Sequence, residues 1–283
     1  MTKVAAVIVA YNNKEMLRSL ILDLYAQKRK LDEIIVIDNG SVDGTSLMMA
    51  SEFSIARHVR FEKNKGSAGG FHEGIKMACE QNDLIWTLDD DVSVDQEALF
   101  FLLNWFEVLN KKDNVGVVRS WGRHSFKSPE PYKTKSFAWR GSLLNREMIK
   151  KIGLPRADYF LYGDDTEYSL RMCGLGYVLY LIPESKVIEK RMIGKINFSI
   201  TSIHFLIYKD PPRLYYAHRN QINIFLEYRE YKMLFLTLCY GLKVIIFFMF
   251  LKRLAGFRHI RAIIDGINDG FAGRLGENPK YLP

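Results

Sequence analysis

Short apolar runs alternate with helix-like segments through about the first 120 residues, and this alternation restricts the fold more than any other feature of the chain. Strands are predicted at Val4–Val9, Glu33–Ile37, Val59–Glu62 and Leu84–Leu88. Helices are predicted at Lys14–Ala26, Thr45–Glu52, from the glycine-rich segment to Glu80, and at Gln96–Leu109. Such alternation is typical of a parallel sheet covered by helices. We therefore predict an α/β domain, with Asn12 and Asn13 as N-cap residues of its first helix.

The pattern changes in the second half of the chain. Strands are predicted at Val115–Val118, Ser136–Trp139 and Tyr177–Ile182, and helices at Arg146–Ile152 and Thr166–Cys173. The stretch from Arg191 to Pro212 is basic and irregular, which indicates a mobile segment, and the chain beyond Arg213 is helical and very apolar. We predict a domain over residues 1–190 and a second region, a mobile loop followed by helices, over residues 191–283.

Three consecutive aspartates, Asp89–Asp91, directly follow the predicted strand Leu84–Leu88. Ligands of open α/β sheets bind beyond the carboxyl ends of the strands. Two carboxylates two residues apart, Asp89 and Asp91, point the same way and can hold one hard divalent cation. Such a cation neutralises a diphosphate leaving group. The alternative is an acidic turn that caps the next helix, a role that Asp95 would fill equally well.

A glycine-rich segment lies between a predicted strand and a predicted helix. It contains Lys65, Gly66, Gly69 and Gly70. Loops of this kind let backbone amides approach a phosphate. The spacing is not the dinucleotide-binding fingerprint, so a simple tight turn is an equal alternative. The phosphate interpretation gains support because Asp38 and Asp89–Asp91 also follow strands, at one edge of the predicted sheet.

A second acidic pair, Asp164 and Asp165, precedes the predicted helix Thr166–Cys173. Asp164 could cap that helix, which is the purely structural interpretation. Asp165 could then project into a cleft as a general base, because a carboxylate that faces a substrate hydroxyl can accept its proton.

Together these motifs resemble the family 2 glycosyltransferases, which have the GT-A fold. The matching segments are Val9–Asn12, Val36–Ser41, the glycine-rich segment, Asp89–Asp91, and Asp164–Asp165 with Glu167. The resemblance extends from about Val4 to Glu189. Three further segments, Asn64–Gly74, Arg213–Asn220 and Asp265–Gly276, resemble the galactofuranosyl- and rhamnosyltransferase branch.

The resemblance implies a role for each matching residue on the donor side. Asp38 would recognise the nucleotide base with Tyr11 near it, and Asp90 would face the donor sugar or ribose. The sugar pocket would be lined by Trp139, Arg140 and Gly141.

The resemblance also implies a metal and a catalytic base. Asp89 and Asp91 would lie at a Mn²⁺ or Mg²⁺ ion and the diphosphate. Asp165 would deprotonate the acceptor hydroxyl in a one-step displacement with inversion, and Asp164 would orient hydroxyls. Relatives often supply a histidine as a further metal ligand, whereas this chain has Glu189, which could serve as an oxygen ligand.

The net charge of +8 favours partners that carry phosphate. No recognition helix, RNA-binding motif or zinc finger is present, and the basic residues gather in the apolar tail, so we expect no nucleic-acid partner. Cys79, Cys173 and Cys239 show no spacing typical of disulfides or zinc sites, which fits a reducing compartment. The N-terminal apolar run is too short for a signal peptide, and we expect a cytosolic catalytic part.

The apolar segment Met233–Leu251 is near the minimum length that spans a bilayer, but Lys243 lies at its centre. It is followed by a basic flank suited to anionic headgroups, comprising Lys252, Arg253, Arg258, His259 and Arg261. We predict peripheral attachment to the cytoplasmic face of the membrane. A buried helix and a homo-oligomer interface are the alternatives.

The resulting prediction is an inverting, metal-dependent hexosyltransferase that uses a nucleotide-sugar donor and a glycan or lipid-linked acceptor in cell-surface polysaccharide synthesis. UDP-galactofuranose is the first donor hypothesis and dTDP-rhamnose the second. An inactive scaffold is disfavoured because the acidic positions are all present. A nucleotidyltransferase is disfavoured because residues 10–13 lack a glycine-rich phosphate loop.

Overall fold

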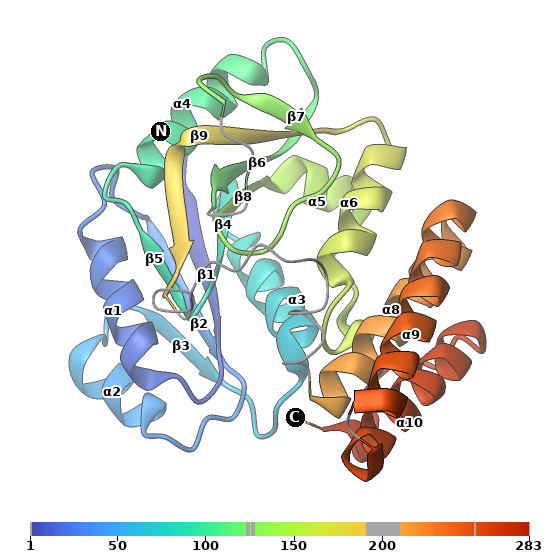
Figure 1. The fold of residues 1–283 in the computed structure, drawn as a ribbon. Coiled ribbons are helices and arrows are strands. Elements are labelled where there is room, and N and C mark those ends of the chain that lie inside the picture. Colours follow the sequence, from blue (N-terminus) through green and yellow to red (C-terminus); the bar gives the residue numbers. More distant parts are fainter. Residues whose placement is uncertain (1, 123–124, 126–127, 191–209, 252, 283) are drawn as a thin grey trace. The chain divides into compact units, whose positions relative to one another are not determined.

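A computed structural model describes residues 2–122, 125, 128–190, 210–251 and 253–282 (Figure 1). The basic stretch Arg191–Pro212, predicted to be mobile, lies outside the described residues except for residues 210–212. The chain divides into two compact units, one of Met1–Arg156 with Tyr168–Lys195 and one of Ala157–Glu167 with Ile196–Pro283. The domain boundary predicted at residue 190 stays a prediction, and the short stretch 157–167 groups with the C-terminal helices.

The first unit is built on a nine-stranded mixed sheet. Its strands are β1 (Val4–Ala10), β2 (Glu33–Asp38), β3 (Arg57–Arg60), β4 (Leu84–Asp89), β5 (Val92–Val94), β6 (Val115–Trp121), β7 (Tyr132–Thr134), β8 (Ser142–Asn145) and β9 (Val178–Glu189). Their order is β3-β2-β1-β4-β8-β6-β9-β5, with β7 beside β9. Strands β1 to β4 are parallel, so their carboxyl ends share one edge of the sheet.

Helices cover both faces of this sheet (Figure 1). One face carries α1 (Lys14–Tyr25), α2 (Thr45–Glu52) and α4 (Ala98–Leu109), and the other carries α3 (Gly66–Ala78), α5 (Arg146–Ile152) and the part of α6 (Asp164–Gly174) from Tyr168 onward. All seven residues of β1 are buried, because alternate side chains enter the two cores. The continuous apolar runs of the sequence follow from this two-sided burial.

The α/β prediction is confirmed, and α2 and α5 have the predicted bounds. Strand β3 begins two residues earlier than predicted, and β5, β7 and β8 were not predicted. The predicted strand Ser136–Trp139 is wrong. Its alternating aromatic residues are buried, but the backbone N–H of Phe137 donates to Ser169 Oγ (3.2 Å) rather than to a neighbouring strand.

The glycine-rich segment is not a loop, because α3 begins at Gly66 and includes Gly69 and Gly70. A methyl group on Gly70 would lie 2.5 Å from Val9 Cγ1, and one on Gly74 would lie 2.4 Å from Val7 Cγ1. These two glycines therefore let α3 pack closely against β1, a role that does not involve a ligand.

Asn13 occupies the N-cap position of α1, but its side chain makes no capping hydrogen bond. The expected capping role of Asn12 and Asn13 is therefore wrong. Instead Asp43 Oδ2 accepts from the Lys14 backbone N–H at 2.8 Å, which satisfies one free donor at the helix start. The side chains of the two asparagines instead make hydrogen bonds at the sheet edge, with Asp90 and with the Val42 N–H.

The second unit contains α8 (Pro211–Glu227), α9 (Tyr231–Leu251) and α10 (Arg253–Phe271), with short 3₁₀ turns at Ala157–Tyr159 and Pro279–Tyr281. Helix α8 begins two residues before the predicted Arg213, because Asp210 caps it and Pro211 suits its first position. Gly266 and Gly270 allow α10 to approach α8, since a methyl group on either would lie 2.6 Å from a backbone oxygen of α8.

Candidate active site

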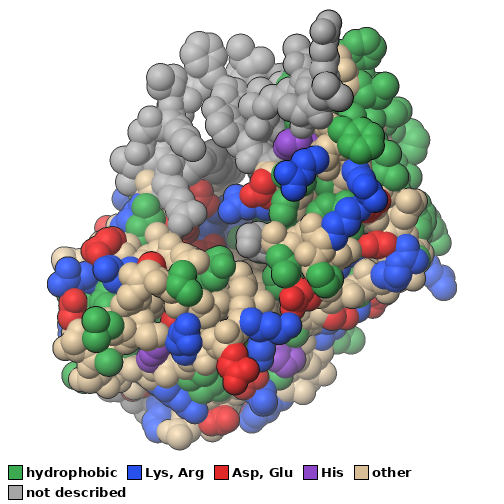
Figure 2. All heavy atoms as spheres, turned by 90° about the horizontal axis from the view of Figure 1, so that it is seen from below, with side chains coloured by type: hydrophobic (Ala, Val, Ile, Leu, Met, Phe, Trp, Pro, Cys, Tyr) green, Lys and Arg blue, Asp and Glu red, His purple; other side chains and the backbone are tan. Residues whose placement is uncertain are grey.

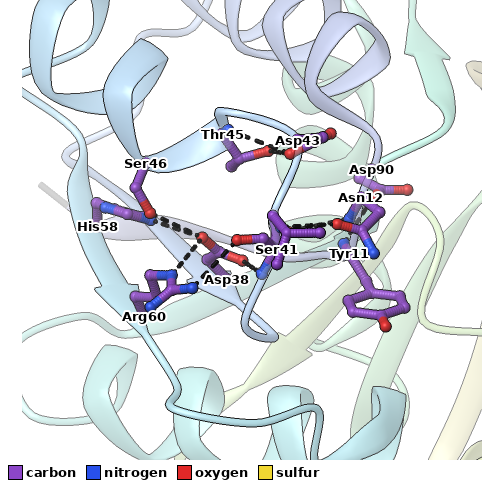
Figure 3. Close-up of polar contacts among 11 residues, drawn as sticks. Tyr11, Asn12, Asp38, Ser41, Asp43, Thr45, Ser46, His58, Arg60 and Asp90 are labelled. Atoms are coloured by element: carbon purple, nitrogen blue, oxygen red, sulfur yellow. Dashed lines mark hydrogen bonds and ion pairs between the residues drawn. The ribbon is translucent and has the colours of Figure 1, made fainter.

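Asp90 joins the carboxyl ends of β4 and β1. Its carboxylate accepts from the Tyr11 backbone N–H at 3.0 Å and from Asn13 Nδ2 at 2.9 Å (Figure 3). Tyr11 is thereby fixed at the sheet edge with 39% of its surface exposed, where its ring can stack on a planar ligand. The helix after the triplet, α4, has Glu97 at its N-cap without a side-chain capping hydrogen bond, and the Asp95 side chain accepts from the Glu97 N–H at 3.0 Å in the turn before it.

Asn12 joins the ends of β1 and β2. Its backbone N–H donates to Ser41 Oγ at 3.0 Å, and its side-chain oxygen accepts from the Val42 N–H at 2.8 Å. Asn12 adopts a left-handed backbone conformation (φ 49°), which asparagine tolerates better than most residues. We call the residues linked in this way the strand-end network: Tyr11, Asn12, Asn13, Asp38, Ser41 and Asp90.

Asp38, at the end of β2, is fully buried. Its carboxylate accepts from the Ser41 N–H at 2.7 Å and from Ser46 Oγ at 3.2 Å (Figure 3). His58 Nε2 lies 3.5 Å away and Arg60 Nε 3.8 Å away, both at ion-pair distance. Burial raises the pKa of Asp38, but the interactions with His58, Ser41 and Ser46 outweigh it and lower the pKa to about 2.

This burial bears on the role predicted for Asp38. The carboxylate has no exposed surface and is already engaged by the protein, so direct contact with a base would require a shift of the Ser41 loop. In the described conformation Asp38 holds that loop, and base recognition by Asp38 stays a prediction.

The start of α3 is tied to β2 through Asn39. Asn39 Nδ2 donates to the Gly66 carbonyl oxygen at 3.1 Å, and its side-chain oxygen accepts from the Lys65 N–H at 3.3 Å. Gly66 has φ +73°, which a glycine adopts without strain. Lys65 Nζ lies 4.2 Å from the centre of the Phe61 ring. Backbone amides at a helix start suit an anion, so phosphate binding here remains the prediction for Lys65, Gly66, Gly69 and Gly70.

The predicted metal ligands fall on two strands. Asp89 ends β4, Asp91 lies in the turn before β5, and Glu189 ends β9, where it forms an ion pair with Arg140. Among the described residues, no three His, Cys, Asp or Glu side chains gather in a metal-binding group. Two half-buried carboxylates suit Mg²⁺ or Mn²⁺, which proteins often hold through one or two carboxylates together with substrate phosphates.

In the segment predicted to line the sugar pocket, Trp139 and Gly141 make contacts within the protein, and their place in such a pocket stays a prediction. Trp139 is buried and packs against Phe71, with ring centres 5.0 Å apart, and its carbonyl oxygen accepts from Thr87 Oγ1 at 2.6 Å. Gly141 has φ +78°, and its N–H donates to the Thr87 carbonyl oxygen at 2.8 Å. Arg140 is half-exposed, so of the three it offers the charged group that a ligand can contact.

The acidic pair lies in the second unit, in the first turn of α6. Asp164 is buried, whereas Asp165 is half-buried, and Asp165 Oδ1 accepts from the Thr166 N–H at 2.7 Å. Carboxylates in the first turn of a helix are favoured by the helix dipole. The partly exposed Asp165 carboxylate fits a base that must meet a hydroxyl better than the buried Asp164 does.

Several residues of this site were not predicted from the sequence. His58 and Arg60 on β3 contact Asp38, and Asn13 and Asn39 tie neighbouring segments together. The segment Arg57–Arg60 carries basic side chains two residues apart on a strand, so one face of β3 is basic. That pattern is a signal that could have placed His58 and Arg60 together beside Asp38.

Comparison with known proteins identifies the class to which this fold and site belong. The family model for glycosyl transferase family 2 matches residues 5–163, which is more than half of the chain. The chain belongs to glycosyl transferase family 2. The matched range contains the strand-end network and the Asp89–Asp91 triplet.

Individual relatives are more distant. A poly-β-1,6-N-acetyl-D-glucosamine synthase of Staphylococcus aureus (strain COL) is 30% identical over 102 residues, and the match covers 35% of this chain and 24% of the relative. The chain thus spans about a quarter of that relative. A dTDP-rhamnosyl transferase of Shigella flexneri is 24% identical over 239 residues, covering 77% of this chain and 78% of the relative.

Solved structures show the same fold. A mannosyltransferase of Pyrobaculum calidifontis, in complex with GDP-Man and Mn²⁺, superimposes with a TM-score of 0.59 at 15% identity and covers 98% of this chain and 77% of its own. Residues 1–349 of S. aureus TarS, in complex with UDP-GlcNAc, superimpose with a TM-score of 0.61 at 14% identity and cover 95% and 81%. The fold is GT-A, as the resemblance implied.

Proposed function

We propose that this protein is an inverting glycosyltransferase that moves a sugar from a nucleotide-sugar donor to a hydroxyl of a glycan or lipid-linked acceptor. The acceptor oxygen attacks the anomeric carbon while the bond from that carbon to the diphosphate oxygen breaks. The electron pair leaves with the diphosphate, and Asp165 takes the proton of the hydroxyl. A single displacement of this kind inverts the anomeric centre.

The observation that carries this proposal is the strand-end network. Asp90 and Asn12 connect the ends of three parallel strands through side-chain contacts that need no ligand. Preorganised polar groups at this edge are where an α/β sheet binds its ligand. The exposed Tyr11 ring and the amides at the start of α3 supply surfaces for a base and for phosphate.

Asp89 and Asp91 are proposed to hold a divalent cation in this site. When bound, Mn²⁺ or Mg²⁺ neutralises charge that develops on the departing diphosphate. Asp89 is the last residue of β4 and Asp91 lies two residues later, in the turn before β5. Because Glu189 is paired with Arg140, its place as a third ligand has less support than the two aspartates.

The experiment for this proposal is donor binding by the purified protein. UDP-galactofuranose, dTDP-rhamnose, UDP-GlcNAc and GDP-mannose would be titrated with Mn²⁺, with Mg²⁺ and with EDTA. We expect one donor to bind in the presence of metal and to lose affinity in Asp91→Ala, with Asp95→Ala as the control because Asp95 only caps a turn. Failure of every donor under all three conditions would contradict the proposal and favour a scaffold.

Two donors have specific support. The segment Gly66–Phe71 resembles the galactofuranosyltransferase branch. The Shigella flexneri relative, which matches most of both chains, is named a dTDP-rhamnosyl transferase. The same titration distinguishes them, because the two donors differ in both base and sugar.

Peripheral attachment to an anionic membrane is the second part of the proposal. Helix α9 contains a segment, Tyr231–Phe250, that is long and apolar enough to cross a membrane, and 22% of its most apolar window is buried. Its exposed side chains include Phe235, Leu242, Ile246 and Phe250. Figure 2 shows hydrophobic side chains gathered at its upper right, on the side of the C-terminal helices in Figure 1.

The same helices carry exposed basic side chains, among them Lys232, Lys243, Arg258 and Arg261. An apolar stripe with nearby cations suits the interface of an anionic bilayer. Lys243 within the stripe favours a helix that lies in the interface over one that spans the bilayer.

Vesicle sedimentation tests this attachment. We expect binding to phosphatidylglycerol vesicles, weaker binding to phosphatidylcholine vesicles, and loss of binding in Ile246→Glu. Ile55→Glu is a matched control, since Ile55 is 91% exposed on the first unit and Ile246 is 46% exposed on α9. Equal binding by both variants, or association of the protein with itself in place of binding to vesicles, would contradict membrane attachment.

A further inference from the structure

The five residues that lead into the acidic pair have an unusual backbone. Phe160, Tyr162 and Gly163 have φ angles of 63°, 65° and 88°. A left-handed conformation is uncommon for a non-glycine residue and is a true outlier for bulky ones such as Phe160 and Tyr162. Such a segment keeps its shape only where its surroundings hold it, so the contacts that hold residues 159–163 also decide where Asp164 and Asp165 begin.

Helix α8 supplies these contacts through Asn220. The Asn220 side chain is fully buried, and its Nδ2 lies 2.9 Å from the carbonyl oxygens of Tyr159 and Leu161 and 2.6 Å from that of Tyr162. One amide group therefore gathers three carbonyl oxygens of a segment about 60 residues earlier in the chain. An amide has two N–H donors, so the three contacts include a shared one.

Arg219 secures Asn220 in that position. Its Nε donates to the Asn220 side-chain oxygen at 2.8 Å, and its Nη2 donates to the Tyr159 carbonyl oxygen at 2.9 Å. Its Nη1 donates to the Gly276 carbonyl oxygen at 2.6 Å. Arg219 is almost fully buried, and its guanidinium lies 4.7 Å from the Tyr216 ring centre. A buried charge is tolerated when its donors are satisfied, as they are here by carbonyl and amide oxygens.

The same helix also reaches the first turn of α6. Tyr228, directly after α8, donates its hydroxyl to Glu167 Oε1 at 2.6 Å, and Glu167 is buried. Between these two points α8 lies against Gly163, where an added methyl group would be 3.0 Å from Ile224 Cδ1 and 3.2 Å from Asn220 Cβ. Helix α8 thus contacts the acidic segment before, at and after the start of α6.

We infer that Arg219, Asn220 and Tyr228, which we call the α8 clamp, are positioning residues that set the orientation of the Asp165 carboxylate for proton transfer. The inference rests on the proposed role of Asp165 as the base. The clamp residues act through the backbone of residues 159–163 and through Glu167. Small misplacement of a catalytic group lowers the rate by about 100-fold.

The first test needs no substrate. Hydrogen exchange of the full chain would be followed by mass spectrometry in the wild type, Asn220→Ala and Gln221→Ala. Gln221 is the control because it is exposed and adjacent on the same helix. We expect faster exchange of residues 157–167 in Asn220→Ala and no change in Gln221→Ala. Unchanged exchange in a folded Asn220→Ala protein would overturn the inference.

The second test separates positioning from general loss of structure. Hydrolysis of dTDP-rhamnose or UDP-galactofuranose would be followed as release of dTDP or UDP, with water in place of the acceptor hydroxyl. We expect Asn220→Ala to lower kcat by about 50-fold and Tyr228→Phe, which removes one hydroxyl, by about fivefold, with the donor KM within about twofold of wild type.

A double-mutant cycle with Asp165→Asn completes the test. If the clamp acts through Asp165, Asn220→Ala should change the residual rate of Asp165→Asn by less than about threefold. If the two substitutions instead lowered kcat independently, so that their factors multiplied in the double variant, the positioning role of the α8 clamp would be contradicted. The proposed role of Asp165 as the base would be unaffected. A fully active Asp165→Asn protein would instead reject the base and hence the proposed function.

Discussion

Two acidic segments of this chain are held in place by different means. Asp90, in the first unit, is bound by side-chain and backbone donors from the end of the neighbouring strand β1, 77 and 79 residues away in sequence. The segment that leads to Asp165, in the second unit, is bound through its own carbonyl oxygens by Asn220. The first arrangement follows from the topology of a parallel sheet, whereas the second depends on one helix that comes much later in the chain.

The difference shows which side chains are positioned by the sheet topology itself and which require specific contacts from another element. Strand ends converge wherever parallel strands are paired, so polar residues placed there meet with little backbone strain, since the left-handed Asn12 has a conformation that asparagine tolerates. Within residues 159–163, Phe160 and Tyr162 adopt left-handed conformations that bulky residues do not favour, and buried partners on α8 hold the segment. Substitutions should therefore affect the two segments in distinguishable ways.

The largest effect is expected at the base. Asp165→Asn should reduce transfer by about 1000-fold, because it removes the group proposed to accept the proton of the acceptor hydroxyl. Donor binding should be retained, since the residues proposed to bind the donor belong to the other acidic segment. Rate and donor affinity would be measured on the same preparation, with Asp158→Asn as a control because Asp158 is exposed and lies in the same unit. Loss of donor affinity would show that the two segments do not divide binding and catalysis between them.

The first segment could be predicted from the sequence better than the second, because its position follows from a strand end, whereas the second segment is held by a helix far away in the sequence. Strand β4 and the triplet that follows it could be predicted because a buried apolar run ends abruptly in three carboxylates. The link between Asp90 and Asn13 could not be predicted, because asparagine at a helix start usually caps that helix. Gly70 was interpreted as a phosphate contact, but its close approach to Val9 depends on how α3 crosses β1, which no local pattern encodes.

In the second segment, the acidic residues could be predicted from the sequence, but the contacts with α8 that hold the segment could not. Asp164 and Asp165 stand out because two carboxylates precede a helix. Nothing near residue 160 indicates that the carbonyl oxygens of Tyr159, Leu161 and Tyr162 bind Asn220, since these contacts span about 60 residues and involve the backbone. The motif Arg213–Asn220 pointed to a branch of the family without indicating what its residues contact.

The next largest effect concerns the packing beneath the first segment. Gly74→Ala should destabilise the protein by about 2 kcal/mol, because the added methyl group would lie 2.4 Å from Val7 Cγ1 and overpacking a core costs about 1–3 kcal/mol. The midpoint of thermal unfolding should fall by several degrees and donor affinity should fall with it. Gly174→Ala is the matched control, since nothing lies within 4 Å of a methyl group there. If Gly74→Ala were as stable as this control, the close approach of α3 to β1 would be wrong.

The last effect, similar in size to that of Gly74→Ala, is a pH dependence at Asp38. Its pKa of about 2 lies below the ordinary value of 3.8, so folding favours the ionised form. The resulting stabilisation is fully present above about pH 5 and is lost as the pH falls from about 4 through 2. A shift of this size corresponds to about 2 kcal/mol at neutral pH, because one pKa unit is worth about 1.4 kcal/mol. Asp38→Asn should therefore lower the free energy of unfolding by about that amount at pH 7, and by progressively less below pH 4.

Denaturant unfolding of wild type and Asp38→Asn between pH 2 and pH 7 measures this difference directly. A difference that narrows toward low pH would support a carboxylate whose ionised form is held by Ser41, Ser46, His58 and Arg60. A difference that is constant with pH would mean that the variant disturbs packing and that the charge of Asp38 contributes little. In that case hydrogen bonds to the Asp38 carboxylate, rather than its charge, would hold the Ser41 loop, and base recognition by Asp38 would still require that loop to shift.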